Sequence, residues 1–302
     1  MEDTSKKVLH KENQRKAFTK EEVFKYFFLI CSILSIFFLF LICIFIFKDS
    51  FGFIGKIGVK NFVLNDSWAP MNVPASYGIL PMVIGSILIT AMSCIAAVPV
   101  SVMVACYLAF DCPKNIYKIL KPALNLMTGI PSIVYGFFAL TVIVPINRSL
   151  FGGTGMNMLS ASILLLIMVL PTIISMAEAS LRTVPKSFYQ GSLSLGATHD
   201  ETITRVMVPA AKSGIFAGII LGVGRAIGET MAVILVAGNQ TRLTFNPLKG
   251  IRTMTTNIVL EMAYAAGEHR QALIATAAVL FIFILLINIG FFIVKSRSEN
   301  NG

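Results

Sequence analysis

Long stretches without charge are the feature that most restricts how this chain can fold. Five of them cover residues 26–47, 67–110, 122–147, 149–177 and 271–294, and each is at least as long as the roughly 20 residues that a helix needs to cross a bilayer. A sixth stretch, 213–241, is interrupted only by Arg225 and Glu229. Since 56% of the 302 residues are apolar and 13% are charged, polar residues are too few to cover a water-soluble globule of this size. The sequence therefore predicts an all-α membrane protein with six transmembrane helices.

The positions of Lys and Arg indicate how these helices are oriented. If the N-terminus lies inside, most of the 25 Lys and Arg residues fall on the inner side, and cytoplasmic loops typically carry such an excess. Both termini are therefore expected in the cytoplasm. The same pattern explains much of the net charge of +10, and the basic N-terminal segment can also lie on anionic membrane lipid, so no nucleic-acid partner is needed.

The chain is expected to form one membrane domain with short flanking segments. We expect a basic cytoplasmic tail, a first transmembrane helix, an extracytoplasmic segment, a core with five transmembrane helices and a short cytoplasmic tail, at residues 1–25, 26–47, 48–76, 77–294 and 295–302. Within the core, helices are expected at about residues 77–110, 120–146, 158–182, 213–241 and 271–294. The first run is too long for a signal peptide and lacks a small-residue cleavage pattern, so it is interpreted as a retained helix.

A polar stretch between two apolar runs, QGSLSLGATHDETITRVMVP at residues 190–209, has a distinctive pattern. It predicts two short helical pieces separated at Gly196, because a residue without Cβ can take the positive φ of a tight turn. Pro209 is expected to end the second piece. Residues 183–212 are therefore interpreted as a compact helical loop on the polar side of the membrane.

The spacing within this loop resembles the cytoplasmic coupling loop of ABC importer permeases. In that family a Glu-Ala-Ala triplet is followed after three residues by Gly and after nine more by Ile-x-Leu-Pro. The corresponding residues here are Gln190, Gly191, Ser192, Gly196, Val206, Val208 and Pro209. Gln190 stands where the family has Glu, so a role for that carboxylate is not carried over. The family's loop docks into a groove on the ATP-hydrolysing subunit, so the resemblance implies a type I ABC importer permease fold with a cytoplasmic coupling helix.

Four further stretches narrow the resemblance. GIPSIVYGFFAL, LPTIISMAEASLRTVP, GRAIGETMAVILVAGN and IRTMTTNIVLEMAYAAGEH resemble the PstC-type permease subunits of phosphate ABC importers, and together with the loop they cover most of residues 77–294. The segment GRAIGETMAV is the most discriminating, because sulfate, molybdate and peptide permeases share the loop but not this Arg and Glu in a membrane helix.

The resemblance implies a function and a set of partners. The chain is expected to be half of the translocation pathway of an ATP-driven phosphate importer in a bacterial inner membrane. A homologous PstA-like permease, two copies of a PstB-like ATPase and an extracytoplasmic PstS-like phosphate-binding protein would complete the importer. Inorganic phosphate is the expected substrate, and no cofactor or metal is expected. The segment at residues 253–265 is expected to dip toward the outer end of the pathway or to pack there as a plug.

The charged residues in the fifth predicted helix are the candidate pathway site. At about 100° per residue, Gly214, Gly218, Gly222, Arg225 and Glu229 fall within an arc of roughly 80° on one helix. Small residues let another helix approach closely, so the charges are expected to face a protein seam or an aqueous cleft. We expect the guanidinium to bind the translocating anion and the carboxylate to occupy it when the anion is absent. The alternative is an ion pair that only stabilises a helix interface.

Other functional classes fit the sequence less well. A membrane-embedded enzyme needs catalytic groups at depth, and Arg225 and Glu229 are the only ionisable residues expected there, because His10, His199 and His269 fall outside the runs. No Gly-x-x-x-x-Gly-Lys-Ser/Thr phosphate loop is present, so ATP hydrolysis is assigned to a separate subunit. The five cysteines show no metal-ligand spacing and are interpreted as packing residues.

Two transport alternatives remain. A channel or secondary carrier lacks the coupling loop, and secondary carriers often show two similar halves, which this sequence does not. An ABC permease for another oxyanion, such as sulfate or molybdate, is the nearest alternative.

Overall fold

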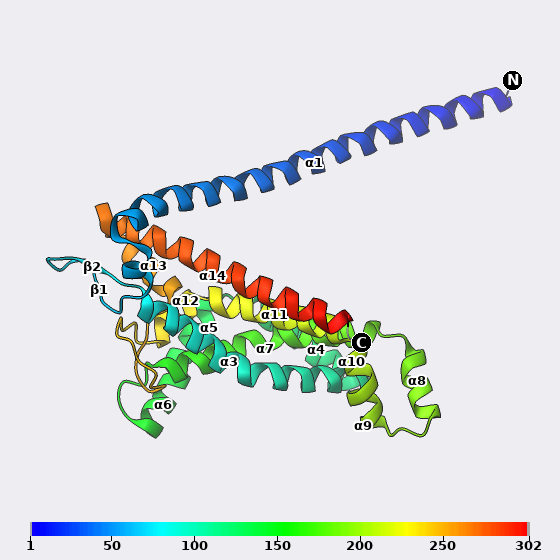
Figure 1. Ribbon diagram of the computed structural model, residues 1–302. Coiled ribbons are helices and arrows are strands. Elements are labelled where there is room, and N and C mark those ends of the chain that lie inside the picture. Colours follow the sequence, from blue (N-terminus) through cyan, green and yellow to red (C-terminus); the bar gives the residue numbers. More distant parts are fainter. Residues whose placement is uncertain (1, 301–302) are drawn as a thin grey trace.

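The computed structural model describes the backbone of residues 2–300 and the side chains of residues 22–293. Helices account for nearly all regular structure in this part of the chain (Figure 1). The helices are α1 (Glu2–Ile57), α2 (Val59–Val63), α3 (Leu80–Cys106), α4 (Lys114–Gly129), α5 (Ser132–Phe138), α6 (Val144–Phe151), α7 (Met158–Thr183), α8 (Lys186–Ser194), α9 (His199–Thr202), α10 (Val208–Ala210), α11 (Lys212–Gly228), α12 (Met231–Val236), α13 (Met254–Met262) and α14 (Gly267–Asn300). Three π-helical turns, η1 (Tyr107–Asp111), η2 (Ala139–Ile143) and η3 (Ile203–Met207), continue the helices that precede them. A single hairpin pairs β1 (Trp68–Ala69) with β2 (Ser76–Tyr77) in antiparallel register.

Five helices of the described chain are long and apolar enough to cross a membrane, judged by length and composition. They cover Glu22–Ile57, Leu80–Asp111, Ser132–Phe151, Met158–Thr183 and Gly267–Ile293. A sixth candidate is the pair His199–Ala210 and Lys212–Gly228, which is bent by 71°. The predicted all-α membrane fold is therefore confirmed, with five candidate spans and a sixth if the bent pair is counted as one.

Helix α7 is the centre of the core. It is the most buried of the candidate spans, because 61% of its apolar 18-residue stretch is buried. Helices α3 and α11 pack along it. Small residues make this close packing possible: a Cβ added at Gly218 of α11 would lie 2.8 Å from the Cβ of Met176, and one at Gly222 would lie 2.7 Å from Cγ1 of Ile173. Gly214 likewise lies against Ser180. The glycine face of α11 is thus the face that contacts α7.

The first helix is longer than expected. Helix α1 runs without a break from residue 2 to residue 57, so the boundaries predicted at residues 26 and 47 are not helix ends. It ends where Gly58 takes a φ of +87°. Its outer part packs on α14, with the rings of Phe47 and Phe281 5.8 Å apart. Toward its N-terminus α1 diverges from the other helices, as Figure 1 shows, and none of its apolar stretch is buried.

The prediction of one continuous helix at about residues 120–146 is wrong in its N-terminal part. Helix α4 ends at Gly129, and the next span begins at Ser132 after Pro131. A residue before proline is disfavoured in the α region, and Ile130 is accordingly extended, with φ −68° and ψ 129°. Helix α4 is therefore a separate amphipathic helix.

The close contact between α11 and α7 leads to a stability prediction. Gly218→Ala places a methyl group against the Met176 Cβ and should destabilise the protein by about 1–3 kcal/mol through overpacking. Gly224→Ala is the matched control, because nothing lies within 4 Å of its added Cβ; there the better helix propensity of Ala should stabilise by up to about 1 kcal/mol. Thermal unfolding of the detergent-purified chain should show shifts of opposite sign. Equal shifts would contradict the packing.

Candidate functional site

The fifth span is broken at Glu229. Helix α11 ends at Gly228, and Glu229 has an extended backbone with φ −68° and ψ 130°. The prediction that Arg225 and Glu229 lie on one continuous helix is therefore wrong at Glu229. The physical reason is a cap: Glu229 Oε1 accepts the backbone N–H groups of Thr230, at 3.0 Å, and Ala232, at 3.2 Å. The carboxylate thus satisfies donors at the start of α12 that have no partner within the helix.

Arg225 lies in the last turn of α11 and is half-buried. Its Nη1 donates a hydrogen bond to Oγ1 of Thr172 on α7, at 3.2 Å. No ion pair joins Arg225 to Glu229 within the described side chains. The two side chains are therefore not paired in this conformation, and the competition of Glu229 for the guanidinium stays a prediction. Because α7 supplies the partner, the charge faces a protein seam.

Helix α13 contacts the break directly. Thr255 Oγ1 donates to the backbone carbonyl of Glu229 at 3.1 Å. Thr253 and Thr256 form a capping box at the start of α13, and the backbone N–H of Met254 donates to Ser86 Oγ of α3 at 3.0 Å. The segment expected to dip toward the outer end of the pathway therefore contacts the broken span directly.

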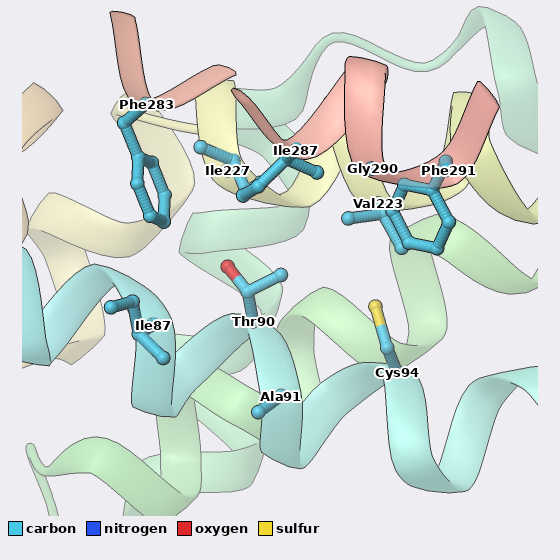
Figure 2. A pocket seen from close by; sticks show the side chains of 10 residues that line it. All are labelled: Ile87, Thr90, Ala91, Cys94, Val223, Ile227, Phe283, Ile287, Gly290 and Phe291. Carbon is cyan, nitrogen blue, oxygen red and sulfur yellow. The ribbon is translucent and has the colours of Figure 1, made fainter. Parts of the chain in front are cut away.

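A large apolar pocket lies apart from Arg225 and Glu229, neither of which lines it. It has a volume of about 510 Å³ and lies between α3, α11 and α14, as Figure 2 shows. Its lining is apolar apart from the Thr90 hydroxyl and the Cys94 thiol. An anion requires donors or positive charge in its surroundings, and this pocket offers no charged side chain. It is therefore not a candidate phosphate site.

The polar loop folds into two helical pieces, as its spacing predicts. Helix α8 is followed by a turn in which Gly196 has a φ of +89°, and α9 starts after Thr198. Ser192 Oγ lies 2.9 Å from Thr202 Oγ1 and joins the two pieces. The second piece does not end at Pro209: it continues to Ala210, and the 71° bend into α11 follows it.

A capping box begins the second piece. The Thr198 hydroxyl accepts the Glu201 N–H, and the Glu201 carboxylate accepts the Thr198 N–H. That backbone N–H, together with the Thr198 hydroxyl, holds the pKa of the Glu201 carboxyl below its usual value. The resulting stabilisation is present at neutral pH and is lost as the pH falls through the lowered pKa.

Aromatic and charged side chains attach the loop to the end of α3. The Tyr189 hydroxyl lies 2.6 Å from Nδ1 of His199, and Nε2 of the same imidazole pairs with Asp111 Oδ1. The rings of Phe110 and Tyr189 are stacked with centroids 6.2 Å apart. The sequence places His199 outside the spans, but no local spacing relates it to Asp111, 88 positions earlier.

The solvent-facing side of the loop combines small and apolar residues. Gln190, Gly191, Gly196 and Pro209 are exposed, and Ser192, Val206 and Val208 are half-buried. The largest exposed apolar side chains beside them are Phe188, at 52%, and Leu195, at 91%. An exposed surface of this kind is typical of a protein interaction site.

A second buried charge was missed by the sequence analysis. Glu178 of α7 is 1% exposed and accepts hydrogen bonds from Tyr117, Lys121 and Arg182 at 2.6–2.7 Å. Arg182 also donates to the Leu108 carbonyl. The cluster joins α4 and the end of α3 to α7, so Arg225 and Glu229 are not the only ionisable residues within the spans. The Glu178–Arg182 spacing of four residues was the one available signal.

No group of three or more His, Cys, Asp or Glu side chains in the described part of the chain could hold a metal ion.

The helical core, the broken fifth span and the bent loop at residues 183–212 define an ABC importer permease of the type I fold. Residues 97–299 match the family model of the binding-protein-dependent transport system inner membrane component, and the chain belongs to this family. It is a multi-pass membrane protein.

Several curated relatives are similar over most of their length. A probable ABC transporter permease protein, YqgH of Bacillus subtilis (strain 168), is 37% identical over 78% of this chain and 82% of its own. The phosphate transport system permease protein PstC of Mesorhizobium japonicum is 31% identical over 75% of both chains. A probable phosphate transport system permease protein PstC of Methanocaldococcus jannaschii is 30% identical over 98% of this chain and 97% of its own.

Solved structures support the fold alone. A chain of a bacterial alginate ABC transporter superposes with a TM-score of 0.60 at 15% identity, covering 92% of this chain and 96% of that one. A chain of the MetNI methionine ABC transporter in an inward-facing conformation has a TM-score of 0.55 at 18% identity, covering 73% and 94%.

The turn in the loop gives a prediction about local stability. Neither Gly196 nor Gly191 has anything within 4 Å of an added Cβ, but only Gly196 has a positive φ. Gly196→Ala should therefore strain the turn by about 1–2 kcal/mol, whereas Gly191→Ala should not. Amide hydrogen exchange of residues 195–202 should accelerate only in the Gly196 variant. Equal exchange in both variants would show that the turn does not need the left-handed conformation.

Proposed function

We propose that this chain is the PstC-type permease subunit of an ATP-driven phosphate importer and forms half of its translocation pathway. The observation that carries the proposal is a half-buried guanidinium, Arg225, at a helix break in the membrane. The chain that presents it is similar, over most of its length, to proteins described as phosphate transport permeases. The guanidinium stays charged at any physiological pH, and its planar donors suit the oxygens of a tetrahedral anion.

The partners follow from the same proposal. A homologous PstA-like permease would complete the pathway, and two copies of a PstB-like ATPase would hydrolyse ATP. The ATPase would bind the loop of residues 183–212, where small residues and exposed Leu195 support a close contact. A PstS-like binding protein would deliver phosphate on the opposite side of a bacterial inner membrane, and both termini of this chain would be cytoplasmic.

The role proposed for Glu229 requires a movement. In the described conformation its carboxylate caps α12, so it competes for Arg225 only after leaving that cap. Such competition would weaken the binding of an anion that carries between one and two negative charges and would help it to leave. The extended backbone at Glu229 supports this role, because the residue is not held by helical hydrogen bonds on both sides.

Removing the guanidinium tests the pathway role. Arg225→Gln loses a charge-assisted interaction of about 1.5–3 kcal/mol, so phosphate uptake should fall by at least about tenfold. Basal ATP hydrolysis and assembly should be nearly unchanged. Arg225→Lys is the control that keeps the charge without the planar donors and should retain part of the uptake. Normal uptake by the Gln variant, measured with labelled phosphate in reconstituted vesicles, would refute the role.

The nearest alternative is an importer for another oxyanion, because a single guanidinium does not by itself distinguish among tetrahedral anions. If phosphate is the substrate, a large excess of sulfate or molybdate should leave uptake of labelled phosphate unchanged, and unlabelled phosphate should abolish it. Strong competition by sulfate would instead favour the alternative.

A further inference from the structure

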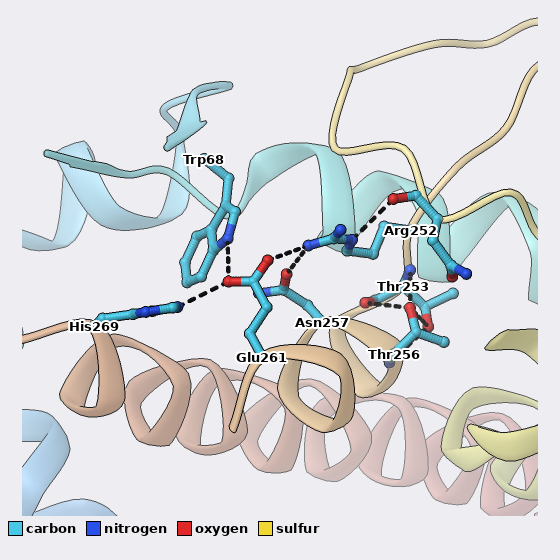
Figure 3. Close-up of polar contacts among 8 residues, drawn as sticks. Trp68, Arg252, Thr253, Thr256, Asn257, Glu261 and His269 are labelled. Carbon is cyan, nitrogen blue, oxygen red and sulfur yellow. Dashed lines mark hydrogen bonds and ion pairs between the residues drawn. The ribbon is translucent and has the colours of Figure 1, made fainter. Parts of the chain in front are cut away.

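A buried carboxylate lies outside the proposed pathway and joins four segments of the extracytoplasmic end. Glu261, near the end of α13, is 6% exposed. Its Oε1 accepts from Arg252 Nη1, and its Oε2 accepts from Trp68 Nε1 at 2.9 Å and pairs with His269 Nε2 at 2.8 Å. Figure 3 shows these side chains converging from the hairpin, the segment before α13, α13 itself and α14. Both oxygens of the carboxylate are therefore used.

The cluster also reaches the far end of α12. Arg252 Nε donates to the backbone carbonyl of Asn239 at 3.1 Å, and Nη1 also donates to Oδ1 of fully buried Asn257 at 2.9 Å. Asn239 stands two residues beyond the end cap of α12 and has a φ of +51°. This turn belongs to a conformation that L-residues rarely adopt, so it needs support from its surroundings.

The near end of α12 is held by the same helix that carries Glu261. At the start of α13, Thr255 donates to the carbonyl of Glu229, whose side chain caps α12. Helix α12 also packs closely on α5, since a Cβ added at Gly136 would lie 2.8 Å from Cα of Ala232. Both ends of α12 are thus attached to the Glu261 cluster, one through Arg252 and one through α13.

We propose that Glu261 is a positioning residue for transport: by holding Arg252 and α13, it keeps α12 and the backbone of Glu229 in place beside Arg225. The role in transport rests on the proposed function. The attachment of α12 does not, because it is independent of the anion that is carried. The carboxylate does not contact the anion. Its charge matters because a buried cation whose partner has been removed is strongly unfavourable.

The test uses a thiol reporter at the end of α12. Ala237→Cys is introduced at a position that is 0% exposed, and labelling of that cysteine by a polar thiol reagent is followed by mass spectrometry in the importer purified with its partner subunits. Glu261→Gln should increase the labelling rate by at least about tenfold, because the neutral amide cannot compensate Arg252 and α12 opens locally. Phosphate uptake per assembled importer should fall in parallel.

Matched variants separate the charge from its surroundings. Glu268→Gln removes an exposed carboxylate next to His269 that pairs with Lys56 at 3.7 Å, and labelling and uptake should stay as in the parent. Trp68→Phe removes one donor while keeping an aromatic ring and should give an intermediate labelling rate. In the double variant Arg252→Gln with Glu261→Gln, the increase in labelling rate should be smaller than the product of the two single-variant increases, because no unpaired charge remains.

The outcomes have distinct meanings. Labelling in Glu261→Gln that equals Glu268→Gln would overturn the proposal, as would faster labelling with unchanged uptake. If Glu261→Gln does not assemble, Trp68→Phe decides: an unchanged labelling rate in that variant overturns the proposal. Multiplicative effects in the double variant would also overturn it, because Arg252 and Glu261 would then act independently. Failure of the phosphate assignment would appear as uptake of another anion by the parent importer and would leave the labelling results unaffected.

Discussion

The close approach of α11 to α7 is the contact on which the placement of the candidate pathway residues depends. With glycine at positions 218 and 222, the backbones come near enough for a Cβ to collide with Met176 or Ile173. This approach aligns the last turn of α11 with Thr172, so that Arg225 finds a hydrogen-bonding partner on α7. A charge at membrane depth is tolerated only when it is paired or wetted. The glycine face therefore contributes both to the packing of the core and to the placement of Arg225 beside Thr172.

The interruptions of the helices are each compensated by a specific group. At Glu229 the lost intrahelical hydrogen bonds are replaced by the carboxylate, which caps α12, and by Thr255, which donates to the Glu229 carbonyl. At Pro131, where a helical conformation of the preceding residue is disfavoured, the Tyr135 hydroxyl donates to the Met127 carbonyl near the end of α4 at 2.8 Å. Irregular backbone at membrane depth is viable only where protein or water satisfies its polar groups. The broken span is consequently the part of the fold that depends most on distant segments.

Features that depend on local chemistry were predictable from the sequence. The apolar runs predicted the spans, and the spacing around Gly196 predicted a loop of two helical pieces. Contacts between distant positions were not predictable: His199 meets Asp111, and Glu261 meets Trp68, and these partners are 88 and 193 positions apart in the sequence. The break at Glu229 was missed for a related reason. The apolar run reads as one span, and the break becomes visible only from the Glu229 carboxylate that caps α12 and from the Thr255 hydroxyl that donates to the Glu229 carbonyl.

The attachment of the cytoplasmic loop has a mechanical consequence. The loop is joined to the end of α3 through Asp111 and His199, and it continues into α11 through a bend of 71°. A partner that touched exposed Leu195 would therefore act on two helices at once, the one that ends beside Asp111 and the one that carries Arg225.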